Sequence, residues 1–179
     1  SIRMKEMTEQ MLQLANADND MVLKKESVDL HPLCKQAAHN IEVSFNRDIH
    51  IIDRGLSSSI FADTNKIKQL VYILLDNARK YSEEEIVVEL GETAGKCYFS
   101  VCDKGMGIPK EDLDKVFDRF YRVDKARNRE SGGAGLGLSI AKQIVDAHQG
   151  TIDFASEEGK GTTVKVTLPK ERKVKAHEK

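Results

Sequence analysis

The sequence is poor in proline, in cysteine and in long apolar runs, and its charges of opposite sign nearly cancel. Only 3 of its 179 residues are proline, and only 3 are cysteine. No apolar run approaches the roughly 18 residues of a membrane-spanning helix, and the first residues do not resemble a signal peptide. With 28 basic and 29 acidic residues, the net charge of -1 gives no overall basic footprint for binding nucleic acid.

Together with a hydrophobic content of 40%, these absences favour a folded domain over a disordered or low-complexity chain. The three cysteines, Cys34, Cys97 and Cys102, are odd in number and lack the spacing of a metal site. They therefore fit a reducing compartment better than a disulfide framework. The glycines are unevenly distributed along the chain, because six of the 12 lie between Gly105 and Gly137.

Apolar residues at helical spacing predict four helices. Residues 1–19 carry a narrow stripe rich in methionine and are expected to belong to a larger helical unit, because so short an amphipathic helix is marginal alone. A second helix is expected to start at His31-Pro32 and a third after the N-cap Asp63, while a fourth runs from Gly135 to His148. The apolar face of the third helix comprises Ile67, Leu70, Val71, Leu74, Leu75 and Ala78.

Short apolar or alternating runs predict the strands. They lie at Val28–Leu30, Ile49–Ile52, Ile60–Ala62, Ile86–Leu90, Cys97–Cys102, Ile152–Ala155 and Thr162–Leu168. Strands with interspersed helices predict an α+β sandwich in which helices cover one face of a sheet. We place one domain boundary near residue 20, and the polar tail after Pro169 is expected to be frayed.

The charges are balanced but segregated along the chain. An acidic run comprises Glu83, Glu84, Glu85, Glu89 and Glu92, with no basic residue between them. A basic stretch inside the glycine-rich region comprises Lys115, Arg119, Arg122, Lys125, Arg127 and Arg129. Such runs are usually solvated faces, but the basic stretch lies between two groups of glycines that could approach a ligand.

Two glycine-rich segments are candidates for binding a ligand. Asp103-Lys104-Gly105-Met106-Gly107-Ile108-Pro109 follows a strand, and its aspartate could accept a hydrogen bond from an exocyclic amine. The run from Gly132 to Leu138 opens a helix, where free backbone N–H groups and the helix dipole favour an anion. Taken singly, the first also fits a plain turn and the second a flexible hinge.

The end of the third helix forms a third candidate segment. Asn77, Lys80 and Tyr81 are spaced i, i+3 and i+4 and so share one face of the helix. An amide oxygen suits Mg²⁺, and a lysine ammonium provides a point charge for phosphate. A polar helix end without function would have the same composition.

In this order, the three segments resemble the ATP-binding domain of sensor histidine kinases, a branch of the superfamily that includes DNA gyrase, heat-shock chaperones and MutL-type repair proteins. The resemblance extends from Val28 to Pro169. Its other motifs are Asp63-Thr64-Asn65-Lys66-Ile67-Lys68-Gln69-Leu70, Val116-Phe117-Asp118-Arg119-Phe120-Tyr121-Arg122-Val123-Asp124 and Gly159-Lys160-Gly161-Thr162. It implies a two-layer α/β sandwich of the Bergerat type, with a mixed sheet covered on one face by helices.

The resemblance also implies ATP and Mg²⁺ as ligands, with Asn77 as the metal ligand and Asn77, Lys80 and Arg122 as catalytic residues. Asp103 would receive the adenine amino group, and residues from about Phe117 to Ala134 would form a lid. The implied ATP-binding residues are Asn77, Lys80, Tyr81, Asp103, Gly105, Gly107, Ile108, Tyr121, Arg122, Gly133, Gly135, Leu136, Gly137, Leu138 and Thr162. Ala134 departs from the pattern, because the family often has Thr or Ser there.

The residue at position 73 helps to decide which branch of the superfamily the chain resembles. ATP-hydrolysing relatives usually carry a Glu four residues before the magnesium Asn, and this chain has Ile73 there. Isoleucine cannot take a proton from water, so the sequence favours a protein histidine kinase over a slow ATPase of the gyrase or chaperone type. Asp76 is a weaker candidate base, since it is rotated about 100° from Asn77 on the helix. A nucleotide-binding regulatory module without phosphotransfer is the other alternative.

None of the five histidines fits the phosphoacceptor signature of the family, a His followed directly by an acidic residue and then by a short Leu-Arg-x-Pro-like run. Residues 1–20 resemble the second helix of the dimerisation and phosphoacceptor hairpin with its connector. We therefore expect three parts: residues 1–20 from that hairpin, residues 21–169 as the catalytic domain and residues 170–179 as a tail. Such a chain should bind nucleotide without phosphorylating itself.

The resemblance implies partners and a location for the intact protein. The expected partners are the phosphoacceptor and dimerisation domain of the same protein and a response regulator, and no nucleic acid. The parent is expected to be a homodimer anchored in the bacterial cell membrane with this domain in the cytoplasm, while the present chain alone is expected to be monomeric.

Overall fold

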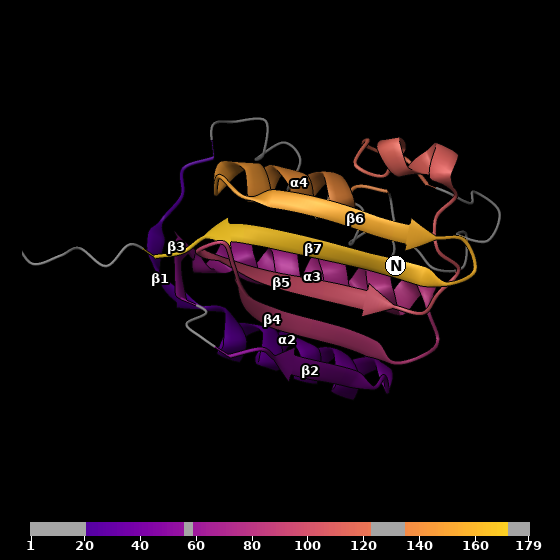
Figure 1. Ribbon diagram of the computed structural model, residues 1–179, viewed down its shortest axis with the longest axis horizontal. Helices are drawn as coiled ribbons and strands as arrows, with labels where there is room; N and C mark the ends of the chain where they lie inside the picture. The colour runs from indigo at the N-terminus through magenta and orange to yellow at the C-terminus, as the bar shows by residue number, and fades with distance from the viewer. Residues whose placement is uncertain (1–20, 56–58, 123–134, 172–179) are drawn as a thin grey trace, which may run out of the picture.

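A computed structural model describes residues 21–55, 59–122 and 135–171. These residues form a five-stranded sheet with helices on one face and a separate two-stranded sheet at one end (Figure 1). The predicted helix over residues 1–19 and most of the polar tail lie outside the described residues. Within those that are described, no helix is both long and apolar enough to span a membrane.

The main sheet is mixed, as the resemblance implied. Its strand order is β2-β4-β5-β7-β6, in which β2 runs parallel to β4 and all other neighbours are antiparallel. The strands are β2 (Ile49–Asp53), β4 (Ile86–Thr93), β5 (Lys96–Asp103), β6 (Thr151–Glu157) and β7 (Gly161–Pro169). Because β5 and β7 lie side by side in the middle, Asp103 at the end of β5 is paired with Thr162 at the start of β7.

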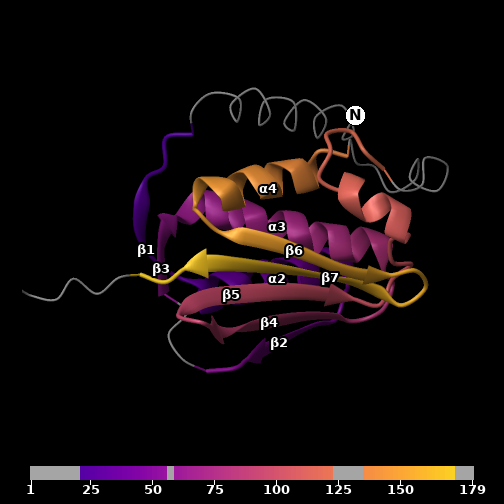
Figure 2. The same cartoon turned by 45° about the horizontal axis from the view of Figure 1, so that its top comes forward.

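Three α-helices cover one face of this sheet, and a short 3-10 helix lies beyond its edge (Figure 2). They are α2 (Leu30–Phe45), α3 (Thr64–Tyr81), the 3-10 helix η1 (Lys110–Lys115) and α4 (Gly137–Ala147). The central helix α3 packs against both α2 and α4. This layer therefore brings the C-terminal end of α3 next to the N-terminal end of α4, and the two ends face the same edge of the sheet.

Helix α3 begins where the sequence predicted and buries the face that its spacing predicted. The Asp63 carboxylate caps it by accepting a hydrogen bond of 3.2 Å from the Lys66 N–H. All six apolar residues of its predicted face are buried: Ile67, Leu70, Val71, Leu74, Leu75 and Ala78. The apolar face that the 3.6-residue period predicts therefore packs against the sheet in one continuous core.

A two-stranded sheet closes the other end of the domain. It pairs β1 (Lys25–Asp29) with β3 (Ser59–Asp63) in antiparallel register. An isolated bridge between Ile60 and Lys170 joins it to the end of β7, and the Glu171 N–H donates to the Ser59 carbonyl at 3.1 Å. The residues after β7 thus tie β3 to the main sheet.

Within the described residues, the seven predicted strands and the three predicted helices after residue 20 are present, and three of the shifts in their boundaries have a local physical cause. Leu30 is the first residue of α2 instead of a strand residue, because Asp29 accepts a hydrogen bond from the His31 N–H and caps the helix there. Strand β4 continues through Gly91 to Thr93, since its ladder with β5 extends to that point. Helix α4 starts at Gly137 and not at Gly135, whose φ of +73° is not helical.

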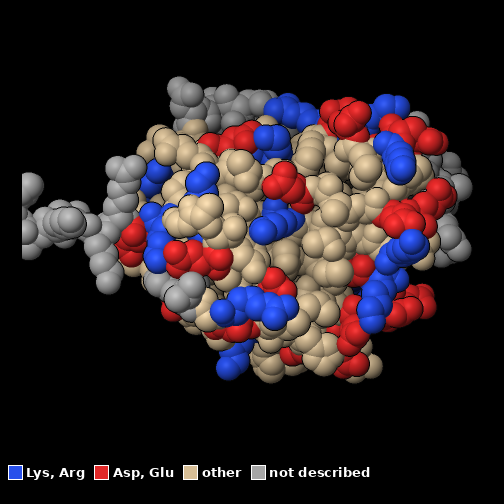
Figure 3. Space-filling model, viewed as in Figure 1, with Lys and Arg blue, Asp and Glu red and all other residues tan. Residues whose placement is uncertain are grey.

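The acidic run of the sequence is partly neutralised by basic residues from other segments. Glu85 pairs with Lys104 at 2.7 Å, Glu89 with Arg54 at 3.0 Å and Glu92 with Lys170 at 2.9 Å. Positive and negative side chains consequently alternate over the sheet face that the helices leave open (Figure 3). A charge run read along the chain therefore does not form a single acidic surface.

Candidate functional site

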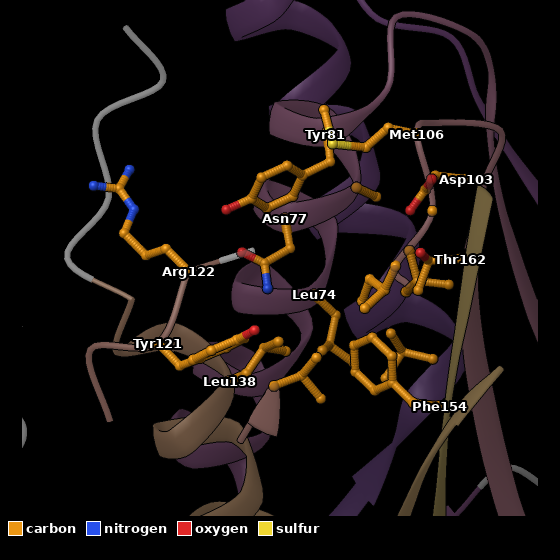
Figure 4. Close-up of a pocket in the computed structure, with 16 residues that line it drawn as sticks. Leu74, Asn77, Tyr81, Asp103, Met106, Tyr121, Arg122, Leu138, Phe154 and Thr162 are labelled. Atoms are coloured by element: carbon orange, nitrogen blue, oxygen red, sulfur yellow. The ribbon is translucent and has the colours of Figure 1, made fainter. Parts of the chain in front are cut away.

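A cavity lies where the ends of α3, α4 and the central strands meet. Asn77 and Tyr81 enter it from α3, and Asp103 and Thr162 enter from β5 and β7 (Figure 4). Tyr121 and Arg122 lie on the side opposite the strands. The remaining lining is mainly apolar and consists of Leu74, Ala78, Val101, Met106, Gly107, Ile108, Val116, Leu138, Phe154 and Val164.

Asp103 is the charged group at the strand side of this cavity. It is only 8% exposed, and burial raises the pKa of its carboxyl, although hydrogen bonds from the Gly105 and Thr162 N–H groups oppose that rise. The Gly105 N–H donates to its Oδ1 at 2.8 Å. A buried carboxylate held by backbone donors in a fixed direction is a strong acceptor for a ligand N–H group.

Thr162 is held beside Asp103 by hydroxyl contacts. Its Oγ1 lies 2.8 Å from the Ser156 Oγ, which in turn accepts the Ile108 N–H at 2.8 Å. These contacts tie the loop after β5 to the neighbouring strands β6 and β7. The strand side of the cavity is thus preorganised by bonds among its own residues.

Two glycines allow the loop after β5 to pass between α3 and the β6–β7 turn. A Cβ atom at Gly105 would lie 2.1 Å from the Tyr81 carbonyl oxygen, which is impossibly close. Gly107 has a φ of +67°, and a Cβ atom there would lie 2.0 Å from the Glu157 carbonyl oxygen. The loop can therefore approach both neighbours only because these residues lack side chains.

The end of α3 presents Asn77 and Tyr81 to the cavity, but not Lys80. Burial raises the pKa of the Tyr81 hydroxyl, while the nearby positive charge of Arg122 opposes the rise. The Lys80 ammonium instead pairs with the Asp76 carboxylate on the same helix, at 2.8 Å. Two of the three predicted residues on this helix face therefore line the cavity.

The N-terminal end of α4 lies against the C-terminal half of α3. A Cβ atom at Gly137 would be 3.3 Å from the Ile73 Cγ2 and 4.0 Å from the Asn77 Oδ1. Leu138 lines the cavity, whereas the Leu136 side chain is buried in the core. The first turn of α4 and the Asn77 amide thus lie close together, although they are separated by 60 residues along the chain.

Tyr121 closes the side of the cavity that faces away from the strands. Its hydroxyl donates a hydrogen bond to Asp112 of η1, and this interaction raises the pKa of Tyr121 to about 12. The preceding residue, Phe120, has a φ of +63°, and its N–H donates to the Gly135 carbonyl at 3.0 Å. These bonds link Phe120 and Tyr121, which belong to the described part of the predicted lid, to η1 and to Gly135, two residues before α4.

The structure brings most of the predicted ATP-binding residues to this one cavity. Those that line it are Asn77, Tyr81, Asp103, Gly107, Ile108, Tyr121, Arg122, Leu138 and Thr162. Those that lie outside its lining are Lys80, Gly105, Gly135, Leu136 and Gly137. Gly133 and most of the predicted lid lie outside the described residues.

The sequence patterns did not identify most of the apolar residues that line the cavity. Leu74 and Ala78 belonged to the predicted apolar face of the third helix and Val101 to a predicted strand, and these patterns gave no sign that the residues border a cavity. Met106 lies between Gly105 and Gly107, which the sequence patterns had already marked as candidates for ligand binding, so its place in the chain could have identified it as a lining residue. Phe154 comes from β6 and packs edge-on against Phe117 with ring centroids 5.5 Å apart, a contact between distant segments.

The residues present are compatible with a bound magnesium nucleotide. Within the described part of the chain, no group of three or more His, Cys, Asp or Glu side chains is placed to hold a metal by itself. Mg²⁺ commonly takes one or two protein ligands and completes its shell with phosphate oxygens and water. An amide oxygen at Asn77, beside the first turn of α4, fits that kind of site.

Residues 62–172 match the protein family described as "Histidine kinase-, DNA gyrase B-, and HSP90-like ATPase". Among curated proteins, the chain is 42% identical over 164 residues to the sensor histidine kinase YkoH of Bacillus subtilis, covering 92% of this chain and 36% of that protein. It is also 42% identical over 176 residues to the sensor histidine kinase WalK of Bacillus subtilis, covering 93% and 28%. The chain thus spans about a third of the length of these relatives.

Solved structures share the fold. The catalytic domain of the histidine kinase ThkA matches with a TM-score of 0.71 and 27% identity, covering 82% of this chain and 96% of that one. Full-length ShkA in complex with AMPPNP matches with a TM-score of 0.80 and 24% identity, covering 90% of this chain and 34% of that one. The expected fold class, an α+β domain with helices on one face of a mixed sheet, is confirmed.

Proposed function

The chain belongs to the histidine kinase-, DNA gyrase B- and HSP90-like ATPase family, and we propose that it is the Mg-ATP-binding catalytic domain of a two-component sensor histidine kinase. Its relatives YkoH and WalK are sensor histidine kinases, and it corresponds to about a third of their length. The observation that carries the proposal is a buried carboxylate, Asp103, on one wall of a mainly apolar cavity whose opposite side is polar and basic.

The strand side of the cavity suits an adenine base. The flat apolar ring would lie among Met106, Ile108 and Phe154, and its exocyclic amino group would donate to Asp103. Thr162, bonded to Ser156, is placed to take part in the same contact directly or through water. A carboxylate prefers the amino group of adenine to the carbonyl oxygen that guanine has at the same ring position, because two acceptors repel each other.

The opposite side suits the triphosphate. Asn77 would hold Mg²⁺ between phosphate oxygens, and the first turn of α4 would present its free N–H groups to the phosphates. Arg122 would approach the γ-phosphate and offset the charge of the transferring group. Gly133, Gly135 and Gly137 would let the backbone come close to the phosphates, and Lys80 would supply a further positive charge.

The proposed reaction transfers the γ-phosphoryl group to an imidazole. The bond between the β,γ-bridging oxygen and the γ-phosphorus breaks, a nitrogen–phosphorus bond forms, and ADP leaves with the bridging oxygen. Mg²⁺, when bound, neutralises phosphate charge and orients the triphosphate. Within the described ranges, neither His31, His39, His50 nor His148 lines the cavity, so the acceptor would come from elsewhere.

A hydrolytic role is less compatible with the site. Ile73 lies against the start of α4 and offers no group that could activate water. Asp76, the other candidate base, is bound by both Arg79 and Lys80. Burial alone would raise the pKa of Asp76, but these two cations hold it below its usual value, so the carboxylate is a poor proton acceptor at neutral pH.

Nucleotide binding is tested by calorimetric titration with ATP, ADP and a non-hydrolysable ATP analogue, with and without Mg²⁺. We expect binding of all three and an increase in affinity for ATP with Mg²⁺. Asn77→Asp should weaken Mg-ATP binding or its productive geometry, because the added negative charge repels the phosphates beside it. Unchanged affinity and unchanged phosphotransfer in this variant would count against the role of Asn77.

Phosphotransfer is tested with radiolabelled ATP and a separately expressed phosphoacceptor hairpin from the parent protein. We expect acid-labile label on the hairpin and none on a histidine of this chain. If ATP binds but no phosphohistidine forms on the native hairpin, the chain is a regulatory nucleotide-binding module instead. Stoichiometric label on this chain alone would overturn the assignment of the acceptor to another domain.

The intact protein would combine this domain with others. Its partners would be its own dimerisation and phosphoacceptor domain, of which residues 1–20 would be the end, and a response regulator. The parent would be a homodimer anchored in the bacterial cell membrane, with this domain in the cytoplasm. Isolation of the domain as a monomer that becomes dimeric only with the hairpin would support this arrangement.

A further inference from the structure

Lys80 is held away from the cavity by a neighbour on its own helix. Its ammonium lies 2.8 Å from the Asp76 Oδ2, and its side chain is only 16% exposed. Lys80 does not line the cavity, although Asn77 and Tyr81 on either side of it do. A lysine that contacts phosphate would have to leave this ion pair or share it.

Asp76 is itself fixed from the other side. The Arg79 guanidinium donates two hydrogen bonds to the Asp76 Oδ1, of 2.7 and 3.0 Å, and stacks on the Phe45 ring at 3.8 Å from its centroid. The Arg79 carbonyl accepts a hydrogen bond of 2.9 Å from Arg47. Asp76 is therefore a held carboxylate and not a freely rotating surface group, so it can restrain the lysine one turn further on.

We propose that Asp76 is a positioning residue that restrains Lys80 in the absence of nucleotide and must give it up, at least in part, when a triphosphate binds. This inference rests on the proposed function, because it assigns the triphosphate to the side of the cavity next to Asn77. It differs from the use of Asp76 as a base, since no proton moves. In this role, the Asp76 carboxylate lowers the affinity of the chain for a triphosphate.

The sign of this effect distinguishes restraint from a merely structural role. If Asp76 only supported α3, its loss would weaken the binding of every nucleotide. If it restrains Lys80, its loss frees a positive charge for the phosphates and also removes a negative charge near them, so triphosphate binding becomes tighter. A ligand without phosphates, such as adenosine, gains nothing from either change.

The experiment compares Asp76→Asn with the unmodified chain by calorimetric titration with the Mg²⁺ complex of a non-hydrolysable ATP analogue. We expect the dissociation constant to fall about threefold to tenfold, the effect of releasing one partly exposed ion pair. Adenosine affinity, measured by NMR titration, should stay within a factor of two. Equal or weaker binding of the analogue by a folded Asp76→Asn variant would overturn the proposal.

Two further variants separate restraint from a general effect of charge. In a Lys80→Met background, Asp76→Asn should give less than half of its effect on a logarithmic scale, because no lysine remains to be released. Glu83→Gln removes one negative charge just beyond the same helix end and should change affinity less than twofold. A gain of the same size in the Lys80→Met background, or from Glu83→Gln, would show a through-space effect only and overturn the restraint.

A structural measurement keeps the proposal open to refutation if Asp76→Asn does not fold. In a crystal structure of the unmodified chain with the magnesium analogue, the Lys80 ammonium should lie within hydrogen-bond distance of a phosphate oxygen. An unaltered Lys80–Asp76 pair with no phosphate contact would refute the restraint. Failure of the unmodified chain to bind any adenine nucleotide would instead refute the proposed function, so the two failures are distinguishable.

Discussion

Asp103 combines near-complete burial with a negative charge, and that combination is costly unless the charge has a partner. Its backbone donors compensate only in part, since burial still raises the pKa of its carboxyl. A ligand amino group would complete the set of donors around this carboxylate. The residue is therefore better explained by a ligand than by the stability of the empty fold.

Asp103→Asn should weaken ATP binding by about tenfold to a hundredfold, the usual contribution of a hydrogen bond to a charged acceptor. The variant should stay folded, because asparagine has nearly the same shape and keeps an oxygen for the Gly105 N–H. Calorimetry gives the affinity, and circular dichroism checks the fold. ATP affinity within a factor of two of the unmodified chain would contradict the adenine contact.

Gly107→Ala should lower the free energy of unfolding by at least about 2 kcal/mol. Alanine is strained at a positive φ, and its Cβ would also collide with the Glu157 carbonyl oxygen. Gly159→Ala is the matched control, because Gly159 has a φ of +80° but open space where a Cβ would lie. It should cost only about 1 to 2 kcal/mol, from strain alone.

Chemical denaturation of the two glycine variants and the unmodified chain measures both free energies. A cost for Gly107→Ala that does not exceed the cost for Gly159→Ala would mean that the loop can shift away from β6. In that case the close approach of the loop would not be required for the fold.

At the scale of secondary structure elements, His148 joins the end of α4 to the start of α3. Its Nδ1 contacts the Ile144 carbonyl at 2.7 Å, and its Nε2 accepts the Asp63 N–H at 3.1 Å. This pair of bonds requires a neutral ring with its proton on Nδ1. The sequence predicted that the fourth helix ends at His148, and His148 is the residue that caps the C-terminal end of α4.

Stability should decrease as the pH falls below about 6.5 because of His148. Burial lowers the pKa of His148 in the folded protein, so the unfolded chain takes up the proton first. The contribution of His148 is therefore full above the pKa of the unfolded chain and is lost as the pH falls from there through the lowered pKa. Its slope is at most about 1.4 kcal/mol per pH unit.

Urea denaturation between pH 5 and 7.5 measures this dependence. His148→Gln should be less stable at pH 7.5 but should lose less stability than the unmodified chain on acidification. His39→Gln is the control, because His39 is exposed, and its pH profile should match that of the unmodified chain. Equal slopes for all three proteins would exclude His148 as the cause.

At the scale of the whole molecule, the described residues share one hydrophobic core. Its buried apolar side chains extend from Val28 on β1 to Leu168 on β7 and form one cluster between the helices and the sheet. The cavity borders the same cluster, since Leu74, Val101 and Val164 belong to the core and also line the cavity. Folding and formation of the site should therefore be a single event.

Deletion of residues 1–20 should leave both the melting temperature and the affinity for Mg-ATP unchanged within about 3 °C and twofold. The expected domain boundary near residue 20 predicts this result, because residues 1–20 are expected to belong to the dimerisation and phosphoacceptor hairpin and not to the catalytic domain. Differential scanning calorimetry and titration of the shortened chain are the measurements. Loss of cooperative unfolding would place the boundary further toward the N-terminus.

Sequence patterns predicted best those features that depend on neighbours within one or two turns of the chain. The N-cap at Asp63 and the buried face of α3 were both correct, because a cap needs only the next three residues and a helical stripe needs only its own period. The start of α4 was placed two residues early, since glycine spacing alone does not show that Gly135 leaves the helical region.

Patterns along the chain could not assign partners between distant segments. Glu89 read as part of an acidic run, but its partner Arg54 comes from the segment after β2. Phe154 carried no signal of a cavity, because its role depends on the place of β6 in the sheet. Lys80 read as a phosphate ligand, and only the rotamers of Asp76 and Arg79 show that it is held.

The sequence by itself determined the fold class, the ordered motifs of an ATP-binding family and most of the residues that meet in the cavity. Helix period, capping and motif order are local properties, so they can be recognised before the chain is folded. The tertiary structure decided which charges are paired, which core residues border the cavity and which predicted ligands face it. Those outcomes depend on side chains brought together across the sheet and between α3 and α4, where sequence separation carries no information about distance.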